Sequence, residues 1–364
     1  MAIPRSIQIN LQNPGWVHCS ARCVRQAFLA GDGFDHRRGW IERRLQFLTG
    51  VFGCEIAAYA VMSNHLHVVV RMAPEQVDSW SDEEVALRWL RAYPGYRDDE
   101  DRADASTVEL EDWKVATRAA DREWVAERRQ RLRSLSWFMR SLCEPIARRA
   151  NLEDDCRGRF WEGRFHSSPL LDEAALLACM VYVDLNPIRA QMATCIEDSG
   201  HTSARQRLTA AGTKNTAPIE GDLEISSATA SKNLIDVAAR PVDSPFEPPW
   251  LASLKRLTAR DRDSGLGGLT PLQYLHLVES SGRIVRGDKR GSIADDLPDL
   301  LERVDPDLNQ SAWALTMCGW RQMSAGSVGK RSNLNREAAR RGHKRARTRC
   351  SLFRRRATTG LEVA

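Results

Sequence analysis

Two apolar runs that follow one another, "CEIAAYAVM" and "HLHVVVRM", constrain the fold of this chain more than any other feature. Each run is short, apolar and bounded by polar residues, and only Ser63 and Asn64 stand between them. This pattern predicts two strands of one sheet joined by a tight turn. Because Val68, Val69 and Val70 follow one another in the second run, we expect it to be a central strand.

Two histidines interrupt the second run. His65 and His67 lie two residues apart, so both side chains point to the same face of the predicted strand. At that spacing the Cα atoms are about 6.5–7 Å apart, and the imidazoles either bind one ion together or line a polar rim. Burying a polar group without a partner costs about 2–7 kcal/mol, so the pair predicts a shared ligand or a polar cluster. His18, in the expected first strand "GWVHCS", is interpreted as a core histidine, and the alternative is a histidine that borders this site.

Helical patterns surround the predicted sheet. Apolar residues at helical spacing predict a helix at 39–50, and "SDEEVALRWLRAY" predicts one at about 82–92 with Ser81 as its cap. The segment "SLSWFMRSLCEPIARRAN" predicts a core helix that Pro145 kinks or ends early. Further along, "GRFWEGRFHSS" indicates a strand or an extended arm, and "DEAALLACMVYVDLNP" indicates a helix capped by Asp172.

Changes of composition along the chain predict its domain organisation. Residues 201–248 are rich in Ala, Ser, Thr, Pro and Asp with little periodicity, which is typical of a linker. We therefore expect a first domain at 1–200 that carries a charged, partly helical insertion at about 95–130. Beyond the linker we expect a small helical accessory domain at 249–320 and a basic, flexible tail at 321–364.

The charge of the C-terminal segment indicates contact with nucleic acid. Residues 330–356 hold twelve Lys or Arg side chains and one acid, Glu337, whereas the whole chain has a formal net charge of only +5. A basic segment of this density favours binding to phosphates. A solvated tail without a partner is the alternative that the composition also allows.

Two features that the sequence lacks indicate where the protein is located. The chain contains no run of 18 apolar residues, and "MAIPRSIQIN" lacks the pattern of a secretory signal, so no membrane partner is expected. The nine cysteines are scattered and form no CxxC pair, which is typical of reduced thiols rather than of disulfides or a zinc ribbon. We therefore expect a cytoplasmic protein.

A tyrosine near the end of the last of these helices is a candidate nucleophile. Tyr182 and Asn186 share a helix face one turn apart if the helix is continuous, although Pro187 biases Asn186 away from helical geometry. A phenol has a pKa of about 10, and a cation that binds the scissile phosphate helps it attack a phosphodiester. The alternative is a tyrosine at a helix–sheet interface, with Asn186 closing the helix.

The arm "RGRFWEGRFHS" alternates basic and aromatic residues, which is a pattern that suits single-stranded nucleic acid. The basic side chains would bind phosphates and the aromatic rings would stack on unpaired bases. The candidate residues are Arg157, Arg159 and Arg164 for phosphates, and Phe160, Trp161 and Phe165 for bases.

Three motifs taken together resemble a known family. "MSNHLHVVV", "FWEGRFHS" and "YVDLNPIRA", in this order and at this separation, resemble the single-tyrosine HUH transposases, and in particular the REP-associated tyrosine transposases. The resemblance covers about residues 14–200. The insertion at 95–130 and all residues beyond 200 depart from the minimal family pattern.

The resemblance implies a fold and an activity. The fold would be α+β, a ferredoxin-like antiparallel sheet with helices packed on it, followed by a mostly helical C-terminal region. A divalent ion, Mg²⁺ or Mn²⁺, would lie between His65 and His67, with Asn186 where the family places a third ligand. Tyr182 would cut single-stranded or hairpin DNA and form a 5′-phosphotyrosine bond, and Arg189 of the third motif would join the DNA contacts.

Two other functions fit the same residues. One is a sequence-specific DNA-binding protein of the same fold that has lost cleavage activity. The other is an RNA-binding ferredoxin-like module, which the absence of aromatic residues in the His-pair strand disfavours. The resemblance is compatible with a monomer and with a homodimer that exchanges its tyrosines.

Overall fold

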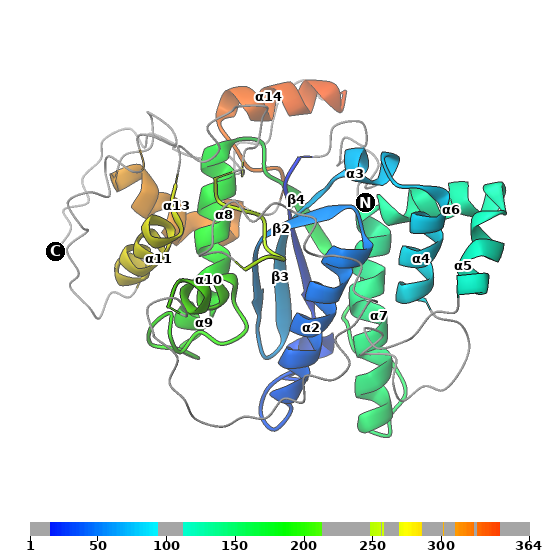
Figure 1. Ribbon diagram of the computed structural model, residues 1–364. Coiled ribbons are helices and arrows are strands. Elements are labelled where there is room, and N and C mark those ends of the chain that lie inside the picture. Colours follow the sequence, from blue (N-terminus) through cyan, green and yellow to red (C-terminus); the bar gives the residue numbers. More distant parts are fainter. Residues whose placement is uncertain are drawn as a thin grey trace.

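A computed structural model of the chain describes residues 15–93, 112–212, 248–255, 257, 269–285, 301, 310–323 and 326–342. A four-stranded antiparallel sheet in the order β2-β3-β1-β4 lies at its centre (Figure 1). The predicted hairpin is confirmed, because neighbouring strands β2 and β3 are joined by a turn in which the Met62 N–H donates to the His65 carbonyl oxygen (2.8 Å). The strands are β1 (Val17–Arg22), β2 (Cys54–Val61), β3 (His65–Met72) and β4 (His166–Pro169).

Helices cover both faces of the sheet (Figure 1). Helices α2 (His36–Val51) and α7 (Leu135–Glu153) pack on one face, where the side chains of Leu66, Val68 and Val70 join their apolar core. Helix α8 (Glu173–Asp184) packs on the opposite face. The predicted combination of an antiparallel sheet with packed helices is therefore confirmed.

Helix α7 continues through Pro145 to Glu153, so the expected early end is wrong. A proline at this position cannot donate to the carbonyl of Ser141, four residues earlier. The buried Arg44 side chain of α2 replaces the missing donor, because its Nε donates to the Ser141 carbonyl oxygen (3.0 Å). A tertiary contact thus satisfies the backbone group that the proline leaves open.

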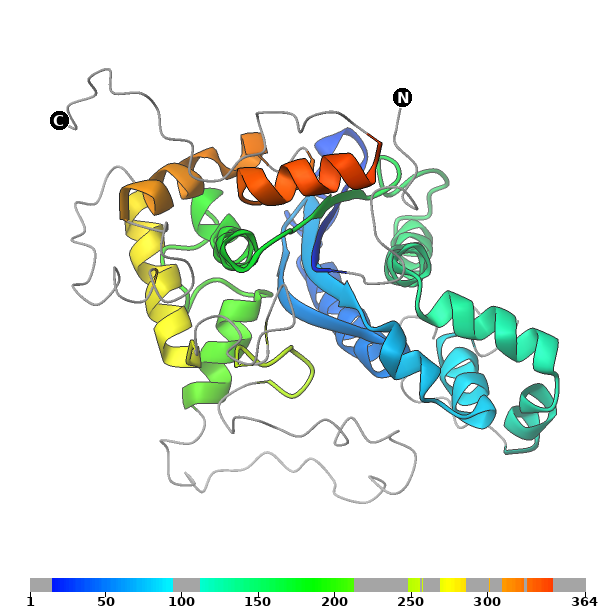
Figure 2. The ribbon, with the colours of Figure 1, turned by 90° about the horizontal axis from the view of Figure 1, so that it is seen from above.

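Four helices project from one side of the sheet (Figures 1 and 2). The described part of the insertion expected at 95–130 is helical, as predicted, and residues 94–111 lie outside the described residues. The predicted cap of the helix before it is also present, because Ser81 Oγ accepts from the Glu84 N–H (3.2 Å). The four helices are α3 (Pro74–Asp78), α4 (Asp82–Ala92), α5 (Asp112–Ala119) and α6 (Arg122–Leu132).

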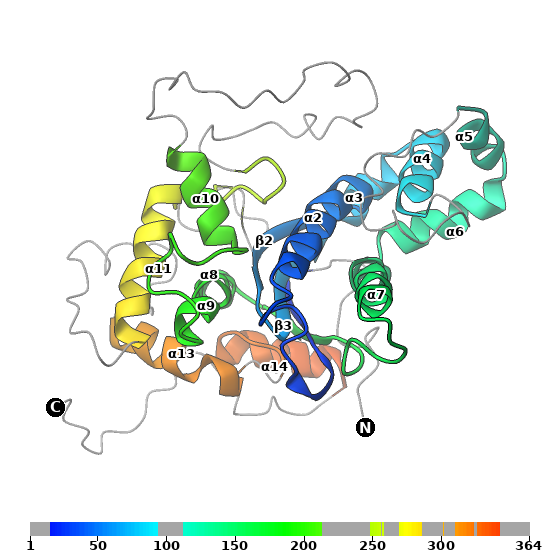
Figure 3. The ribbon, with the colours of Figure 1, turned by 90° about the horizontal axis from the view of Figure 1, so that it is seen from below.

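Several of the helices that follow α8 pack around it: α11 and α13 lie against α8, and α10 contacts β2 (Figure 3). The segment expected as a linker at 201–248 begins with one of them, α10, and its residues 213–247 lie outside the described residues. Of the described helices, none is both long enough and apolar enough to cross a membrane. The helices that follow α8 are α9 (Asn186–Arg189), α10 (Ser203–Gly212), α11 (Pro271–Val285), α13 (Gln310–Met323) and α14 (Arg331–Arg340).

The described C-terminal segments pack on the same core as α8. The buried Arg207 side chain of α10 donates to the Ala57 carbonyl oxygen of β2 (2.9 Å), and the Ala252 N–H donates to that of Ile56 (2.8 Å). Apolar residues of α8, α11 and α13 form one continuous hydrophobic cluster. Described residues after 248 therefore share a core with α8 and the sheet.

Helix α14, in the segment expected as a flexible tail, is attached to β4 and α8. Val328 forms a parallel bridge with Leu170 after β4. The Asp172 carboxylate caps α8 by accepting from the Ala175 N–H (2.9 Å), as predicted. The same carboxylate accepts from the Lys330 N–H (2.7 Å) and so ties the start of α14 to the start of α8 (Figure 2).

Candidate active site

Three histidines lie together on the face of the sheet that α8 covers. Ser20 and Arg22 of β1 lie opposite His67 and His65 of β3 in the strand register, so the side chains of His18, His65 and His67 share this face. His18 Nε2 and His67 Nδ1 are 2.9 Å apart and form a hydrogen bond. The rings of His65 and His67 lie 4.8 Å apart and nearly perpendicular, at 89°. His18 is buried, as expected, but its side chain belongs to the cluster.

Burial keeps two of these imidazoles neutral at pH 7. It lowers the pKa of His18 to about 4 and holds the pKa of His67 well below its ordinary value, with His18, His65 and Arg22 as further causes. The bond between His18 and His67 therefore contains one proton. When Nδ1 of His67 donates it, Nε2 of His67 carries a lone pair suited to a metal ion.

The amide of Asn64 selects the tautomer of His65. Asn64 Nδ2 donates to the Gln26 carbonyl oxygen (3.0 Å), which turns Asn64 Oδ1 toward His65 Nδ1 (2.6 Å). Since an amide oxygen only accepts, the proton of neutral His65 lies on Nδ1. The lone pair of the imidazole is then on Nε2. Gln26 ends the short 3₁₀ helix Val24–Gln26, which packs beside this turn.

Tyr182 reaches the histidines of its own chain from the last turn of α8. Its ring lies 6.1 Å from the ring of His67 and 6.4 Å from the ring of His18, edge-on in both cases. The side chain is 7% exposed. The fold thus brings together a phenol and an imidazole that lie 115 positions apart in the sequence (182 minus 67).

Asn186 closes helix α8. Its Nδ2 donates to the carbonyl oxygens of Tyr182 (3.0 Å) and Val183 (3.2 Å), which are among the carbonyls that the end of the helix leaves open. This is the alternative that the sequence left open for Asn186. Its Oδ1 is the atom that remains as a ligand, and that role stays a prediction.

The donor set fits a divalent ion in part. Among the residues described, no group of three or more His, Cys, Asp or Glu side chains is arranged to hold a metal. The Nδ1 atoms of His65 and His67 both have protein partners, as is usual for metal-binding histidines that coordinate through Nε2. Two imidazoles would therefore hold an ion whose other ligands are oxygens of Asn186, water or a bound phosphate.

Arg189 lies beside the tyrosine. Its guanidinium carbon is 5.2 Å from the centre of the Tyr182 ring. Its Nη1 donates to the Met317 carbonyl oxygen of α13 (3.0 Å), which fixes the side chain in this position. A positive charge next to the phenol favours the binding of an anionic substrate at this position.

The predicted arm lies at the end of the sheet where His65 begins β3. The Val24 N–H donates to the Phe160 carbonyl oxygen (2.9 Å), and the Glu162 N–H donates to that of Arg22 (2.8 Å). Arg22 is the register partner of His65, so the arm runs beside the histidine cluster. Only its last residues, from His166, belong to a strand.

The side chains of the arm separate into exposed cations and anchored rings. Arg157, Arg159 and Arg164 are exposed, and within the described part of the chain no carboxylate pairs with them. Trp161 and Phe165 are half-buried, and Trp161 Nε1 donates to the Cys143 carbonyl oxygen (2.8 Å). Phe160 was also expected to stack on bases. It is 2% exposed in the core, so that prediction is wrong.

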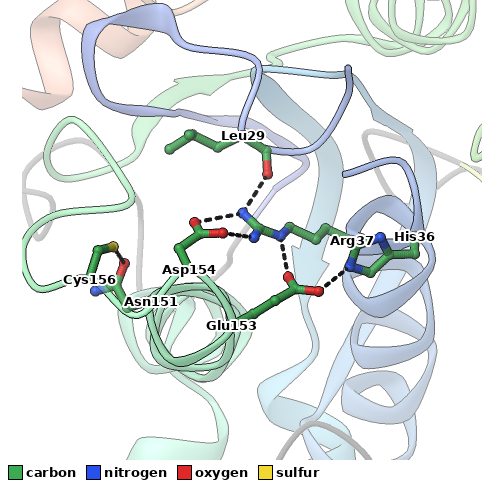
Figure 4. A network of polar contacts seen from close by, with 7 residues as sticks. All are labelled: Leu29, His36, Arg37, Asn151, Glu153, Asp154 and Cys156. Carbon is green, nitrogen blue, oxygen red and sulfur yellow. Dashed lines mark hydrogen bonds and ion pairs between the residues drawn. The ribbon is translucent and has the colours of Figure 1, made fainter. Parts of the chain in front are cut away.

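A buried arginine fixes the start of the arm (Figure 4). Arg37, in the first turn of α2, donates to both oxygens of Asp154 and through Nε to Glu153 (2.7 Å). It also donates to the Leu29 carbonyl oxygen (3.1 Å). The network joins the end of α7 to the loop before α2, and residues 157–165 begin from this anchored point.

Three residues near the cluster were not predicted from the sequence. Arg22 and Arg25 are exposed beside the turn that carries His65, and Phe28 is 54% exposed. The backbone of Ala30 holds this loop to the turn, because its N–H donates to the Ser63 carbonyl oxygen (2.8 Å). An isolated aromatic residue in a polar loop was the one available signal, and it marked only Phe28.

Comparisons with known proteins identify no relative of this chain. No protein-family model matches the sequence, no curated protein matches it significantly, and no solved structure matches the fold.

Proposed function

We propose that this protein is a DNA transposase that cuts and rejoins single-stranded hairpin DNA through Tyr182. The observation that carries the proposal is the position of the Tyr182 ring, 6.1 Å from His67 and 6.4 Å from His18 of the same chain. Because both groups belong to one chain, a monomer suffices for cleavage and no exchange of tyrosines between subunits is needed. The site would act in the cytoplasm on hairpin DNA.

The strand order supports a ferredoxin-like classification. The order β2-β3-β1-β4 places the first and third strands in the middle and the second and fourth at the edges. Helix α2 connects β1 to β2, and α7 precedes β4, on the same face of the sheet. Two such β-α-β units would form the ferredoxin-like part of the molecule, with α8 and the described C-terminal helices added to the other face.

His65 and His67 would hold the divalent ion through Nε2, with Asn186 Oδ1 as the candidate third ligand. The bound ion would supply positive charge that neutralises the scissile phosphate. Imidazole ligands suit Mn²⁺ better than Mg²⁺, which prefers oxygen. The partners of the two Nδ1 atoms keep both rings oriented for this role.

The reaction would exchange one phosphate ester for another. The Tyr182 oxygen forms a bond to phosphorus, and the bond from phosphorus to the 3′ oxygen breaks. The phenol proton ends on the departing oxygen, which leaves a 3′-OH and a 5′-phosphotyrosine. Attack by a 3′-OH on that ester reverses the step and joins the strands. The Arg189 guanidinium would stabilise negative charge on the phosphate during attack.

The arm would guide the single strand to the tyrosine. Arg157, Arg159 and Arg164 offer three cations without carboxylate partners in the described chain, and phosphates would bind them. Trp161 and Phe165 expose part of their rings for stacking on unpaired bases. RNA binding on an open sheet is disfavoured, because helices cover both faces.

The test is formation of a covalent adduct. The full chain is incubated with 5′-labelled and internally labelled hairpin single strands and Mn²⁺, and adducts are separated on a denaturing gel. We expect an adduct with wild type and none with Tyr182→Phe, which removes only the hydroxyl. Equal cleavage by the two proteins would show that Tyr182 is not the nucleophile.

Two observations favour the alternative of a DNA-binding protein without cleavage. Tyr182 is only 7% exposed, and the Asn186 amide is turned toward its own helix. Tight hairpin binding without adduct in Mn²⁺, Mg²⁺, Co²⁺ or Zn²⁺ would support this alternative. The adduct assay therefore separates the two functions directly.

A further inference from the structure

We propose that α13 completes the active site and that Trp320 is a positioning residue for Tyr182. This inference rests on the proposed function. It assigns a role to a C-terminal helix that lies outside the segment resembling transposases. The role follows from direct contacts between α13 and the groups around the tyrosine.

The first contact joins two rings. The Trp320 ring lies 5.8 Å from the Tyr182 ring, tilted by 32°. His67 and His18 meet the same tyrosine edge-on. Aromatic pairs at these distances and angles are attractive, and each restricts the rotation of its partner. Tyr182 thus has histidines of the sheet and a tryptophan of α13 as neighbours, so its hydroxyl has few alternative positions.

The second contact joins α13 to the cation. Met317 lies three residues before Trp320, so the two occupy the same face of α13. The Met317 carbonyl oxygen accepts from Arg189 Nη1 (3.0 Å), and the Arg189 guanidinium lies 5.2 Å from the Tyr182 ring centre. One turn of α13 therefore contacts both the predicted nucleophile and the cation beside it.

The contacts of the Trp320 side chain indicate that it acts through the shape of its ring. The side chain is fully buried, yet its indole N–H has no hydrogen-bond partner among the described residues. An unpartnered buried donor lowers stability. A phenylalanine would fill most of the same space without that donor. The ring surface facing Tyr182, and not the hydrogen bond, is then what Trp320 contributes.

A nucleophile held in one orientation reacts faster than one that must be ordered during attack. Replacing the tryptophan by a flexible side chain should therefore lower the rate of adduct formation more than it changes DNA binding. For Trp320→Leu we expect a loss of about 10–100-fold in the single-turnover rate, with the hairpin Kd within about twofold of wild type. Trp320→Phe should restore the rate to within about threefold.

Trp313 provides a matched control on the same helix. It is fully buried like Trp320, and its Nε1 donates to Ser281 Oγ of α11 (2.9 Å). It lies seven residues before Trp320, about 10 Å along the helix axis. Trp313→Leu should lower the thermal midpoint of unfolding at least as much as Trp320→Leu while leaving the adduct rate per folded molecule within about twofold.

A spectroscopic measurement tests the ring contact without catalysis. The chain contains five tyrosines, so 3-fluorotyrosine gives a small ¹⁹F spectrum in which Tyr182→Phe assigns the Tyr182 line. Trp320→Leu should shift that line, because the ring current of the indole is removed, and Trp313→Leu should not. Unchanged lines of the other tyrosines show that each variant is folded.

The outcomes separate the two proposals. An adduct in wild type with an unaltered rate in Trp320→Leu overturns the positioning role and leaves the transposase proposal standing. Equal rate losses in Trp320→Leu and Trp313→Leu, without rescue by Trp320→Phe, reduce Trp320 to a structural residue. Absence of any wild-type adduct overturns the proposed function and with it the catalytic part of this inference, while an unshifted ¹⁹F line overturns the ring contact itself.

Discussion

The two faces of β3 are made from one short sequence and have opposite characters. Leu66, Val68 and Val70 point into an apolar core formed with α2 and α7. His65 and His67 point to the other face, where α8 presents Tyr182. The same strand therefore contributes to an apolar core on one face and to the candidate site on the other.

The difference shows how polar groups are accommodated inside an otherwise apolar sheet. On the first face the side chains are apolar, so packing contacts are all that their burial requires. On the second face, Nδ1 of each imidazole has a hydrogen-bond partner, His18 for His67 and Asn64 for His65, which offsets part of the cost of burying the rings. Substitutions on the two faces should consequently affect different measurements.

The largest effect is expected from the histidine face. His65→Ala or His67→Ala should lower the rate of adduct formation about a thousandfold, equivalent to ~4 kcal/mol, because each removes a ligand of the proposed ion. The rate is measured under single turnover with Mn²⁺. The control is His166→Ala, which removes an exposed imidazole on the same sheet face and should change the rate less than threefold. Equal losses in all three variants would refute the assignment.

Leu66→Ala tests the opposite face. Leu66 is fully buried, and truncating such a side chain costs about 2–5 kcal/mol of unfolding free energy. Urea unfolding followed by circular dichroism measures the loss. At low temperature, where the variant is folded, its adduct rate should stay within about threefold of wild type. A rate loss comparable to that of His67→Ala would mean that the two faces are not independent.

The acid sensitivity of the histidine face gives a third test. The pKa of His18 is about 4 in the folded chain and about 6.5 when exposed, so the unfolded chain binds the proton more readily. The contribution of neutral, buried His18 to the free energy of unfolding should be at its full value above pH 6.5. It should fall by about 3 kcal/mol as the pH drops to 4. His18→Gln, which does not titrate but keeps a hydrogen-bonding side chain, should flatten this dependence. Urea titrations with EDTA at several pH values measure it, and an equally steep curve in the variant would contradict the cause.

The smallest effects are expected at the arm, outside both faces. Arg157→Gln, Arg159→Gln and Arg164→Gln should each weaken hairpin binding about two- to fivefold and lower the salt slope of log K by ~0.7, the contribution of one phosphate contact to a single strand. Fluorescence anisotropy at several salt concentrations measures both. Arg148→Gln is the matched control, because this exposed arginine of α7 is already paired with Glu144. An unchanged slope in all three variants would exclude the arm as a phosphate-binding segment.

Local pattern was enough for the elements of the central layer. The run of apolar residues around Ser63 and Asn64 predicted β2 and β3, and Asp172 and Ser81 marked helix starts that the structure confirms. Propensity failed at Pro145, where the helix continues because Arg44, distant in sequence, bonds the carbonyl that the proline leaves open. A sequence pattern within a short segment carries no information about a hydrogen-bond partner that another helix supplies.

The candidate site was likewise predictable from short-range patterns only in part. Spacing alone places His65 and His67 on one face, since side chains alternate along any strand. No spacing rule predicts that His18 bonds His67, or that Trp320 lies 5.8 Å from Tyr182, because those pairs are 49 and 138 residues apart (67 minus 18; 320 minus 182). Phe160, which looks like a stacking residue in sequence, is buried because the arm folds back onto β1.

The sequence by itself determined which residues could do chemistry: the His pair, the lone tyrosine of its helix and the basic arm, each recognisable from residue type and short-range periodicity. The tertiary structure alone decided which of them meet. It turned the Asn186 amide toward its own helix, set Arg189 beside the phenol and brought α13 against Tyr182. The physical reason is that periodicity fixes the direction of a side chain within its element, whereas the packing of elements against a common core fixes the distance between side chains of different elements.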